Sequence, residues 1–395
     1  MSRYRLEVAG VFRQHEQEFL SRSRLSAPQL RAFRDICACR TAALGSHIEQ
    51  CDNDNCSRQI IAYDSCRNRH CPKCQSSARD KWLLARSAEL LPVPYSHVVF
   101  TLPSELSDLA LQNRRIVYGI LFRAVSETLL TIAADPRHLG AQLGFLAVLH
   151  TWNQKLLHHA HLHCLIPAGG LSPNRSRWVR SRRRFLLPVA VLRKMFRGKF
   201  LSFLAEAFRR KQLRFSGRLT DLATSTAFDR FLRQLRSKVW VVYAKRPFGS
   251  PEHVIKYLAR YTHRVAISNG RLTEITDREV TFRWRDSADS NRQKLMTLDA
   301  VTFIRRFLLH VLPAGFVKIR HFGFMANRSR REAVALCRSL LPPLSNRDAT
   351  FITENQRRAV DRKCPFCKIG TLCLIGRMPP GEVISAGTVF TPDTS

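Results

Sequence analysis

Cysteine spacing constrains this chain more than any other feature, because seven of its twelve cysteines fall between Cys37 and Cys74. Within that region the sequence CDNDNCSRQIIAYDSCRNRHCPKCQ begins with one pair of cysteines and ends with another. Paired cysteines at short spacing, separated by a loop, are typical of four-thiolate sites that fold around zinc. In a reducing compartment, metal binding explains so many cysteines better than disulfide bonds do. We therefore predict a structural zinc ion bound by Cys51, Cys56, Cys71 and Cys74.

Other cysteines and histidines suggest further metal sites, although single residues of these types also pack in protein cores. A second site near the first has as its candidate ligands Cys39, His47, Cys66 and His70. Near the C-terminus the sequence CPFCKIGTLC contains another CxxC pair, which is a typical zinc-binding spacing. The candidate ligands of this zinc knuckle are Cys337, Cys364, Cys367 and Cys373.

The charge balance points to a polyanionic partner. The chain of 395 residues has 65 Lys and Arg against 30 Asp and Glu, a formal net charge of +35. Nucleic acid is the favoured partner, because basic membrane binders concentrate charge on one amphipathic helix and here arginine is spread along the chain. The stretch SPNRSRWVRSRRRF interleaves arginines with aromatics, as in surfaces that bind single strands, although a solvated basic loop has the same composition. Its candidate DNA-binding residues are Arg175, Arg177, Trp178, Arg180, Arg182, Arg183 and Arg184.

The sequence also bears on location and cofactors. The first residues, MSRYRLEVAG, lack the apolar core of a signal peptide. The longest apolar stretch contains Arg123 and Glu127, so it is predicted to be a buried helix and not a membrane span. We therefore expect a soluble, cytoplasmic protein without a membrane partner. The chain has no P-loop and no Rossmann glycine pattern, so no nucleotide cofactor is expected.

Hydrophobic periodicity divides the chain into four expected segments. Residues 1–90 form an N-terminal helical zinc-binding domain, and residues 91–325 form a core in which strands alternate with helices. A basic segment with the zinc knuckle follows at 326–375, and residues 376–395 are expected to be a disordered tail. Within the core we predict a strand at SHVVFTLP, a helix over about 113–133, a hairpin over 143–171 and a hairpin turn at Asn269-Gly270.

The second arm of the predicted hairpin carries the sequence HAHLHC. Side chains alternate across a strand, so His161 and His163 share one face and lie within reach of one metal ion. Gln154, across the turn, is a candidate oxygen ligand. The alternative is that the two histidines only pack in the core and that Gln154 is an ordinary polar residue near a turn.

Two tyrosines one helical turn apart are the candidate nucleophiles. In PEHVIKYLARYTHR, Pro251 and Glu252 start a predicted helix, and Tyr257 and Tyr261 lie on one face of it. Helical tyrosines at this spacing are usually a packing pair. The histidine pair and the strongly basic composition favour a role for these tyrosines as nucleophiles.

Four stretches together carry a resemblance to a known family: SCRNRHCPKCQ, HAHLHCLIPAGG, YLARYTHRVAISNGRL and IRHFGFMANRSR. They resemble, in the family's order, the insertion-sequence family ninety-one transposases. These are two-tyrosine rolling-circle transposases of the histidine-hydrophobic-histidine (HUH) endonuclease superfamily. The resemblance runs from about Arg31 to Leu341. It implies an α+β fold in which an antiparallel ferredoxin-like, RRM-like sheet carries the metal, beside an N-terminal zinc-binding domain.

The resemblance also implies a reaction. The histidine motif falls on His161 and His163, and the tyrosine motif falls on Tyr257 and Tyr261. With Mg²⁺ or Mn²⁺ at the histidines, tyrosine attack on single-stranded transposon ends would leave a 5′-phosphotyrosine and a free 3′-OH for rolling-circle transposition. Hairpin ends and target DNA are then the expected partners, and the bacterial nucleoid is the expected place of action.

Two other functions fit parts of the sequence. A non-catalytic, zinc-dependent DNA-binding regulator needs only the cysteines and arginines, and it leaves the paired histidines and tyrosines unexplained. A two-histidine phosphoesterase needs two separate HxT or HxS motifs, which the chain lacks.

Overall fold

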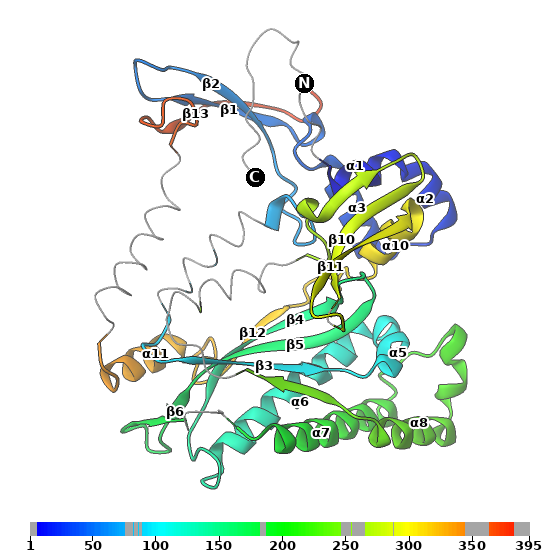
Figure 1. Cartoon of the computed structure of the whole chain (residues 1–395), viewed down its shortest axis with the longest axis vertical. Helices are drawn as coiled ribbons and strands as arrows, with labels where there is room; N and C mark the ends of the chain where they lie inside the picture. The colour runs from blue at the N-terminus through cyan, green and yellow to red at the C-terminus, as the bar shows by residue number, and fades with distance from the viewer. Residues whose placement is uncertain are drawn as a thin grey trace.

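The computed structural model describes residues 6–75, 82, 86, 89–181, 187–245, 254, 265–286, 288–343 and 363–382. The largest sheet has five strands. In Figure 1 this sheet, with long helices on one side, forms the lower part of the molecule. The N-terminal helices and a second sheet lie above it, and a small sheet made from both ends of the chain lies farthest away. Helices and antiparallel sheets are thus mixed, as the predicted α+β fold requires.

The main sheet has the strand order β12-β4-β5-β3-β8, and every neighbouring pair is antiparallel. Its strands are β3 (Tyr95–Thr101), β4 (Gly144–Trp152), β5 (His158–Pro167), β8 (Val241–Ala244) and β12 (Ile319–Gly323). The central strands β4 and β5 form the predicted hairpin around a short turn. A smaller ribbon, β6 (Gly169–Leu171) with β7 (Trp178–Arg180), follows directly.

Helices cover one face of this sheet (Figure 1). They are α5 (Ser107–Gln112), α6 (Arg114–Ala134), α7 (Val189–Arg209) and α8 (Ser225–Ser237), with short 3-10 turns at Ser104–Leu106 and Gly217–Ala223. Apolar residues of β3, β4 and β5 that point to this face, such as Phe100, Leu149 and Leu162, are fully buried against them. Within the described residues α6 alone is long and apolar enough to cross a membrane. It packs beside α7 in the core that these helices form with the sheet, so it is the buried helix that the sequence predicts.

A second core joins the N-terminal helices to residues far along the chain. The helices α1 (Val8–Gln14), α2 (Glu16–Arg22) and α3 (Ala27–Ala38) pack with α10 (Ala300–Leu308) and the sheet of β9 (Leu272–Ile275), β10 (Glu279–Asp286) and β11 (Arg292–Asp299). Phe12 illustrates the packing, because its ring stacks on Phe33 and meets the ring of Phe307 edge-on. The N-terminal helices therefore share a core with residues of the predicted segment 91–325.

The small sheet has the order β13-β1-β2, built from β1 (Ser46–Cys51), β2 (Gln59–Tyr63) and β13 (Leu372–Met378). Residues from both ends of the chain thus form one antiparallel sheet. The predicted boundary at 376 is wrong, since it falls inside β13 and the described chain continues to Glu382. Local pattern did not reveal β13, because its partner lies more than 300 residues earlier in the sequence.

One predicted turn is wrong. Asn269-Gly270 is not a hairpin turn but part of the 3-10 turn Asn269–Arg271 before β9, where the Asn269 side chain accepts a hydrogen bond from the Val8 N–H. The helix α11 (Arg330–Ser339) packs with Leu90 and Leu91 on the other face of the main sheet, the face opposite α6 and α7.

Candidate metal centre and cysteine clusters

Three histidines lie together on the face of the main sheet opposite α6 and α7. The register pairs His150 of β4 with His161 of β5, and Val148 with His163. Directly opposed residues share a face of an antiparallel sheet, so His150, His161 and His163 all point the same way. One ring nitrogen from each lies within 4.8 Å of the others. The predicted histidine pair is therefore part of a group of three.

Hydrogen bonds orient two of these rings. His161 Nδ1 lies 2.7 Å from the carbonyl oxygen of His159, so Nδ1 carries the proton and Nε2 is left as a lone-pair donor. His163 Nδ1 lies 2.9 Å from Nε2 of His97, which comes from the neighbouring strand β3. The rings of His97 and His163 are stacked, with their centroids 5.1 Å apart. Such outer partners are what fixes ring orientation in metal sites.

Burial keeps the imidazoles of His161 and His97 neutral, and the neutral form is the one that binds metal. Desolvation lowers the pKa of His161 to about 4 and that of His97 to about 3. His150 and His163 are 4% and 9% exposed. Neutral imidazoles with oriented lone pairs form a nitrogen donor set for a divalent transition metal.

The structure adds His150 to the predicted histidine pair, whereas the candidate oxygen ligand Gln154 stays a prediction. Gln154 lies in the turn between β4 and β5, where its backbone carbonyl accepts a hydrogen bond from Arg271 at 2.6 Å, and no described contact links its side chain to the histidines. The signal for His150 was present in the sequence, because folding the predicted hairpin about its turn places residue 150 opposite residue 161. Reasoning along one strand missed it.

Tyr257 and Tyr261 lie outside the described residues. Val254, three residues before Tyr257, is described: it is helical, fully buried, and in one cluster with Leu146, Val148 and Leu165. Those three residues share the histidine-bearing face of the sheet. Val254, the described residue nearest the tyrosine motif, therefore lies on that face of the sheet.

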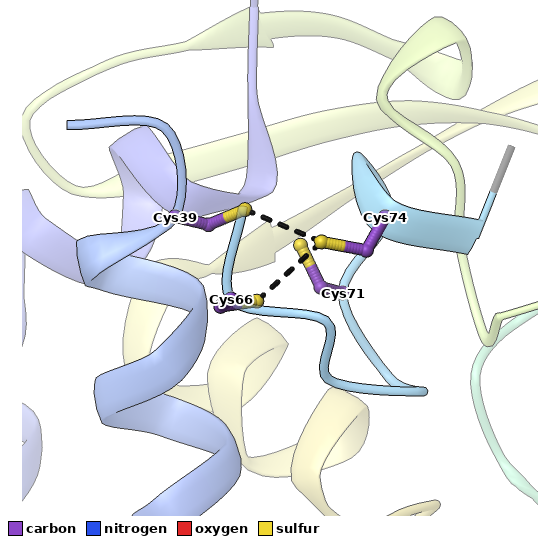
Figure 2. Close-up of side chains that lie close together, drawn as sticks. All are labelled: Cys39, Cys66, Cys71 and Cys74. Carbon is purple, nitrogen blue, oxygen red and sulfur yellow. Dashed lines mark hydrogen bonds between the residues drawn. The ribbon is translucent and has the colours of Figure 1, made fainter. Parts of the chain in front are cut away.

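Four cysteines lie within contact of one another beside the second core (Figure 2). Cys39 follows the end of α3, whereas Cys66, Cys71 and Cys74 come from the segment after β2, and all four side chains point toward one another. Sγ of Cys74 lies 3.5 Å from Sγ of Cys39 and 3.6 Å from Sγ of Cys66. Tetrahedral zinc with bonds of about 2.3 Å would place its sulfurs about 3.8 Å apart, whereas a disulfide would need about 2.05 Å. The geometry fits zinc.

The structure corrects the predicted grouping of the cysteines. Cys51 and Cys56 do not meet Cys71 and Cys74; they lie with Cys364 and Cys367. The error arose from pairing neighbours in sequence, because β1 and β2 carry Cys51 and Cys56 away from the helices.

The other predicted zinc ligands have different partners. His47 contacts the Asp64 carboxylate at 3.0 Å, and Nε2 of the half-buried His70 accepts a hydrogen bond from the backbone N–H of Leu312. Cys337 is buried in the cluster around α11, and Cys373 is exposed on β13. These four residues are not part of either cysteine cluster.

The arginine stretch is only partly described. Arg175, Arg177 and Arg180 are exposed on the β6–β7 ribbon, as a phosphate-binding role requires. The indole of Trp178 is half-buried and packs against Phe324, with 6.1 Å between ring centroids. Arg182, Arg183 and Arg184 lie outside the described residues.

Comparison with known proteins identifies the family. Residues 144–333 match a family model described as "Putative transposase", and residues 11–102 match one described as "Transposase zinc-binding domain". The chain is 50% identical over 384 residues to "Putative transposase y4qJ" of Sinorhizobium fredii (strain NBRC 101917 / NGR234), covering 95% of this chain and 96% of that protein. The chain belongs to the insertion-sequence family ninety-one transposases.

A more distant relative agrees with this assignment. The transposase for insertion sequence element IS801 of Pseudomonas savastanoi pv. phaseolicola is 28% identical over 307 residues, which cover 74% of this transposase and 68% of the relative. No solved structure matches the chain. The match to the transposase model contains the three histidines, and the match to the zinc-binding model contains Cys39, Cys66, Cys71 and Cys74. As a transposase, the protein has DNA as its partner.

Proposed function

We propose that this transposase nicks single-stranded transposon ends by attack of Tyr257 or Tyr261 on a phosphodiester. The observation that carries the proposal is the group His150, His161 and His163 on the sheet face where Val254 is buried. On the helix that the sequence predicts from Pro251, Tyr257 and Tyr261 share one face. That both phenols reach these histidines is part of the proposal.

The three imidazoles are the proposed ligands of the catalytic metal. Of Mg²⁺ and Mn²⁺, the latter suits nitrogen donors better, because Mg²⁺ prefers oxygen. When bound, the ion would polarise the scissile phosphate and stabilise the charge on the departing oxygen. His97 and the carbonyl of His159 would keep the rings turned toward the ion.

The proposed reaction exchanges one ester for another. A tyrosine oxygen forms a bond to phosphorus as the bond from phosphorus to the 3′ oxygen breaks, the phenol loses its proton to solvent, and the 3′ oxygen gains one. The products are a 5′-phosphotyrosine and a free 3′-OH. The ester linkage keeps the energy needed for resealing, so rolling-circle strand transfer requires no nucleotide cofactor.

The remaining features support DNA handling. The exposed arginines of the β6–β7 ribbon would contact phosphates of single-stranded or hairpin ends. Cys39, Cys66, Cys71 and Cys74 would hold a structural zinc that fastens α3 to the segment after β2. We expect the protein to act in the cytoplasm, on the bacterial nucleoid.

A covalent-adduct assay tests the proposal. The purified protein is incubated with a single-stranded oligonucleotide of the transposon end and Mn²⁺, and then denatured. We expect a protein–DNA adduct that survives denaturation, together with a free 3′-OH fragment. Binding without an adduct would favour a non-catalytic regulator, and cleavage without an adduct would favour hydrolysis.

A further inference from the structure

The second cysteine cluster joins two regions that are far apart in sequence. Sγ of Cys51 lies 3.7 Å from Sγ of Cys367, and Sγ of Cys56 lies 3.8 Å from Sγ of Cys364. All four cysteines are free thiols, and these separations match the spacing of about 3.8 Å expected around tetrahedral zinc. The cluster is thus built as a metal site from two cysteine pairs.

Each pair lies on a tight turn of the backbone. In the first, the N–H groups of Cys56 and Ser57 both donate to the carbonyl of Asn53, and Ser57 has a φ of 42°. In the second, the Gly370 N–H donates to Sγ of Cys367 at 3.4 Å. Amide donors directed at sulfur stabilise a thiolate, which is the form that binds zinc.

The two turns fit closely together. A Cβ on Gly370 would lie 2.5 Å from Sγ of Cys51 and 2.7 Å from the Asp52 carboxylate, so only glycine permits this approach. The Asp52 side chain also accepts a hydrogen bond from the Thr371 N–H at 2.6 Å. Arg58 lies over the ring of Phe366, 4.7 Å from its centroid. These contacts hold the two turns in register.

We propose that Cys51, Cys56, Cys364 and Cys367 bind a second structural zinc ion, which fastens residues 363–378 to the β1–β2 hairpin. Cys364 and Cys367 lie outside the match to the transposase zinc-binding domain, which ends at residue 102. Together with the sheet β13-β1-β2, the site has the form of a zinc ribbon closed by the two ends of the chain. The proposal is independent of the tyrosine chemistry.

Thiol protection in the unaltered protein tests the site directly. Cys56 and Cys367 are half-exposed and Cys373 is exposed, so burial alone does not shield the first two from an alkylating reagent. The zinc-loaded protein is treated with N-ethylmaleimide, with and without a chelator, and modified cysteines are identified by mass spectrometry. We expect Cys373 to react in both samples, and Cys56 and Cys367 to react together only after chelation. Equal reaction of Cys56, Cys367 and Cys373 in the zinc-loaded protein would overturn the proposal.

A pair of variants measures the stoichiometry. Cys367→Ala removes one ligand, whereas Cys373→Ala removes a thiol from the same segment outside the cluster. We expect elemental analysis to find one zinc ion fewer per chain in Cys367→Ala, and amide hydrogen exchange in β13 to become at least tenfold faster. Cys373→Ala is expected to match the wild type in both measurements. A Cys367→Ala protein with the full zinc content and unchanged exchange would contradict a zinc site here.

Discussion

At the scale of single residues, the candidate catalytic centre depends on strand geometry that is partly visible in the sequence. Alternation along one strand was enough to place His161 and His163 on one face. The third histidine required the register between two strands, which the turn between β4 and β5 determines. The contact of His163 with His97 is set by a third strand, β3, which lies about 65 residues earlier, and local pattern carries no information about that pairing.

The first prediction distinguishes the group of three histidines from a group of two. His150→Ala should bind single-stranded DNA with wild-type affinity yet lose about 100-fold in cleavage rate, the upper end of the loss seen when a group that supports a metal ligand is removed. His138→Ala is the control, because His138 follows α6 and lies outside the group of three histidines. Cleavage rates and binding curves are measured for both. Equal cleavage rates for the two variants would contradict the assignment of His150 as a metal ligand.

At the scale of elements, periodicity predicted most of the fold. The buried helix α6 and the hairpin β4–β5 both lie within a few residues of their predicted positions, because each is specified by a long apolar pattern. Asn269-Gly270 failed as a hairpin turn because Asn269 is occupied in capping contact with α1. The short strand β13 was missed because its pairing with β1 is entirely long-range.

The second prediction concerns the edge strand β12, whose last residue is Gly323. Gly323 has a φ of +61°, and a Cβ there would overlap the carbonyl oxygen of Leu143. Gly323→Ala should therefore lower the free energy of unfolding by roughly 2 kcal/mol or more. Gly119→Ala is the control of opposite sign: Gly119 lies in α6, where an added Cβ would meet nothing within 4 Å, so alanine should stabilise by up to about 1 kcal/mol. Denaturant unfolding measures both, and a Gly323→Ala protein as stable as the wild type would contradict the close approach.

The third prediction concerns the β6–β7 ribbon. Replacing Arg175, Arg177 and Arg180 with glutamine should weaken single-strand binding and reduce the slope of log affinity against log salt by roughly 0.7 for each phosphate that the ribbon no longer neutralises. Because Trp178 packs against Phe324, we expect the ribbon to bind phosphates more than it stacks on bases. Binding is measured at several salt concentrations. An unchanged slope would mean that these arginines only face solvent.

At the scale of the whole molecule, contacts between residues far apart in sequence determine the cysteine clusters and the second core, and sequence spacing does not predict such contacts. The sequence correctly predicted cysteines in metal-type clusters, but it grouped Cys51 and Cys56 with Cys71 and Cys74. Their partners lie more than 300 residues away, and sequence spacing does not encode such an approach. The same holds for the core that joins α1 to α10.

The fourth prediction concerns the buried histidine His310, which follows α10. His310 is fully buried between Thr151 and Leu156, and burial lowers the pKa of its imidazole to about 3, against about 6.5 in an unfolded chain. Below about pH 6.5 the unfolded chain binds a proton that the folded protein excludes, so stability falls as the pH drops toward 3, by up to about 1.4 kcal/mol per pH unit for this residue.

A variant isolates this effect. His310→Gln removes the titrating group, so between pH 6.5 and pH 5 it should lose about 2 kcal/mol less stability than the wild type does. Denaturant unfolding at the two pH values measures the difference, with His138→Gln, after α6, as the control. Identical acid sensitivity of the wild type and His310→Gln would show that His310 is protonated in the folded protein.

The measurement that tests the account most directly is peptide mapping of the covalent protein–DNA adduct. Single-stranded end DNA is cleaved in the presence of Mn²⁺, the adduct is digested with protease and nuclease, and the nucleotide-bearing peptide is sequenced by mass spectrometry. We predict that the nucleotide is on Tyr257 or Tyr261, and that changing both tyrosines to phenylalanine abolishes the adduct while DNA binding and metal content stay unchanged. A nucleotide on any other residue, or an undiminished adduct from the double variant, would contradict the proposed mechanism.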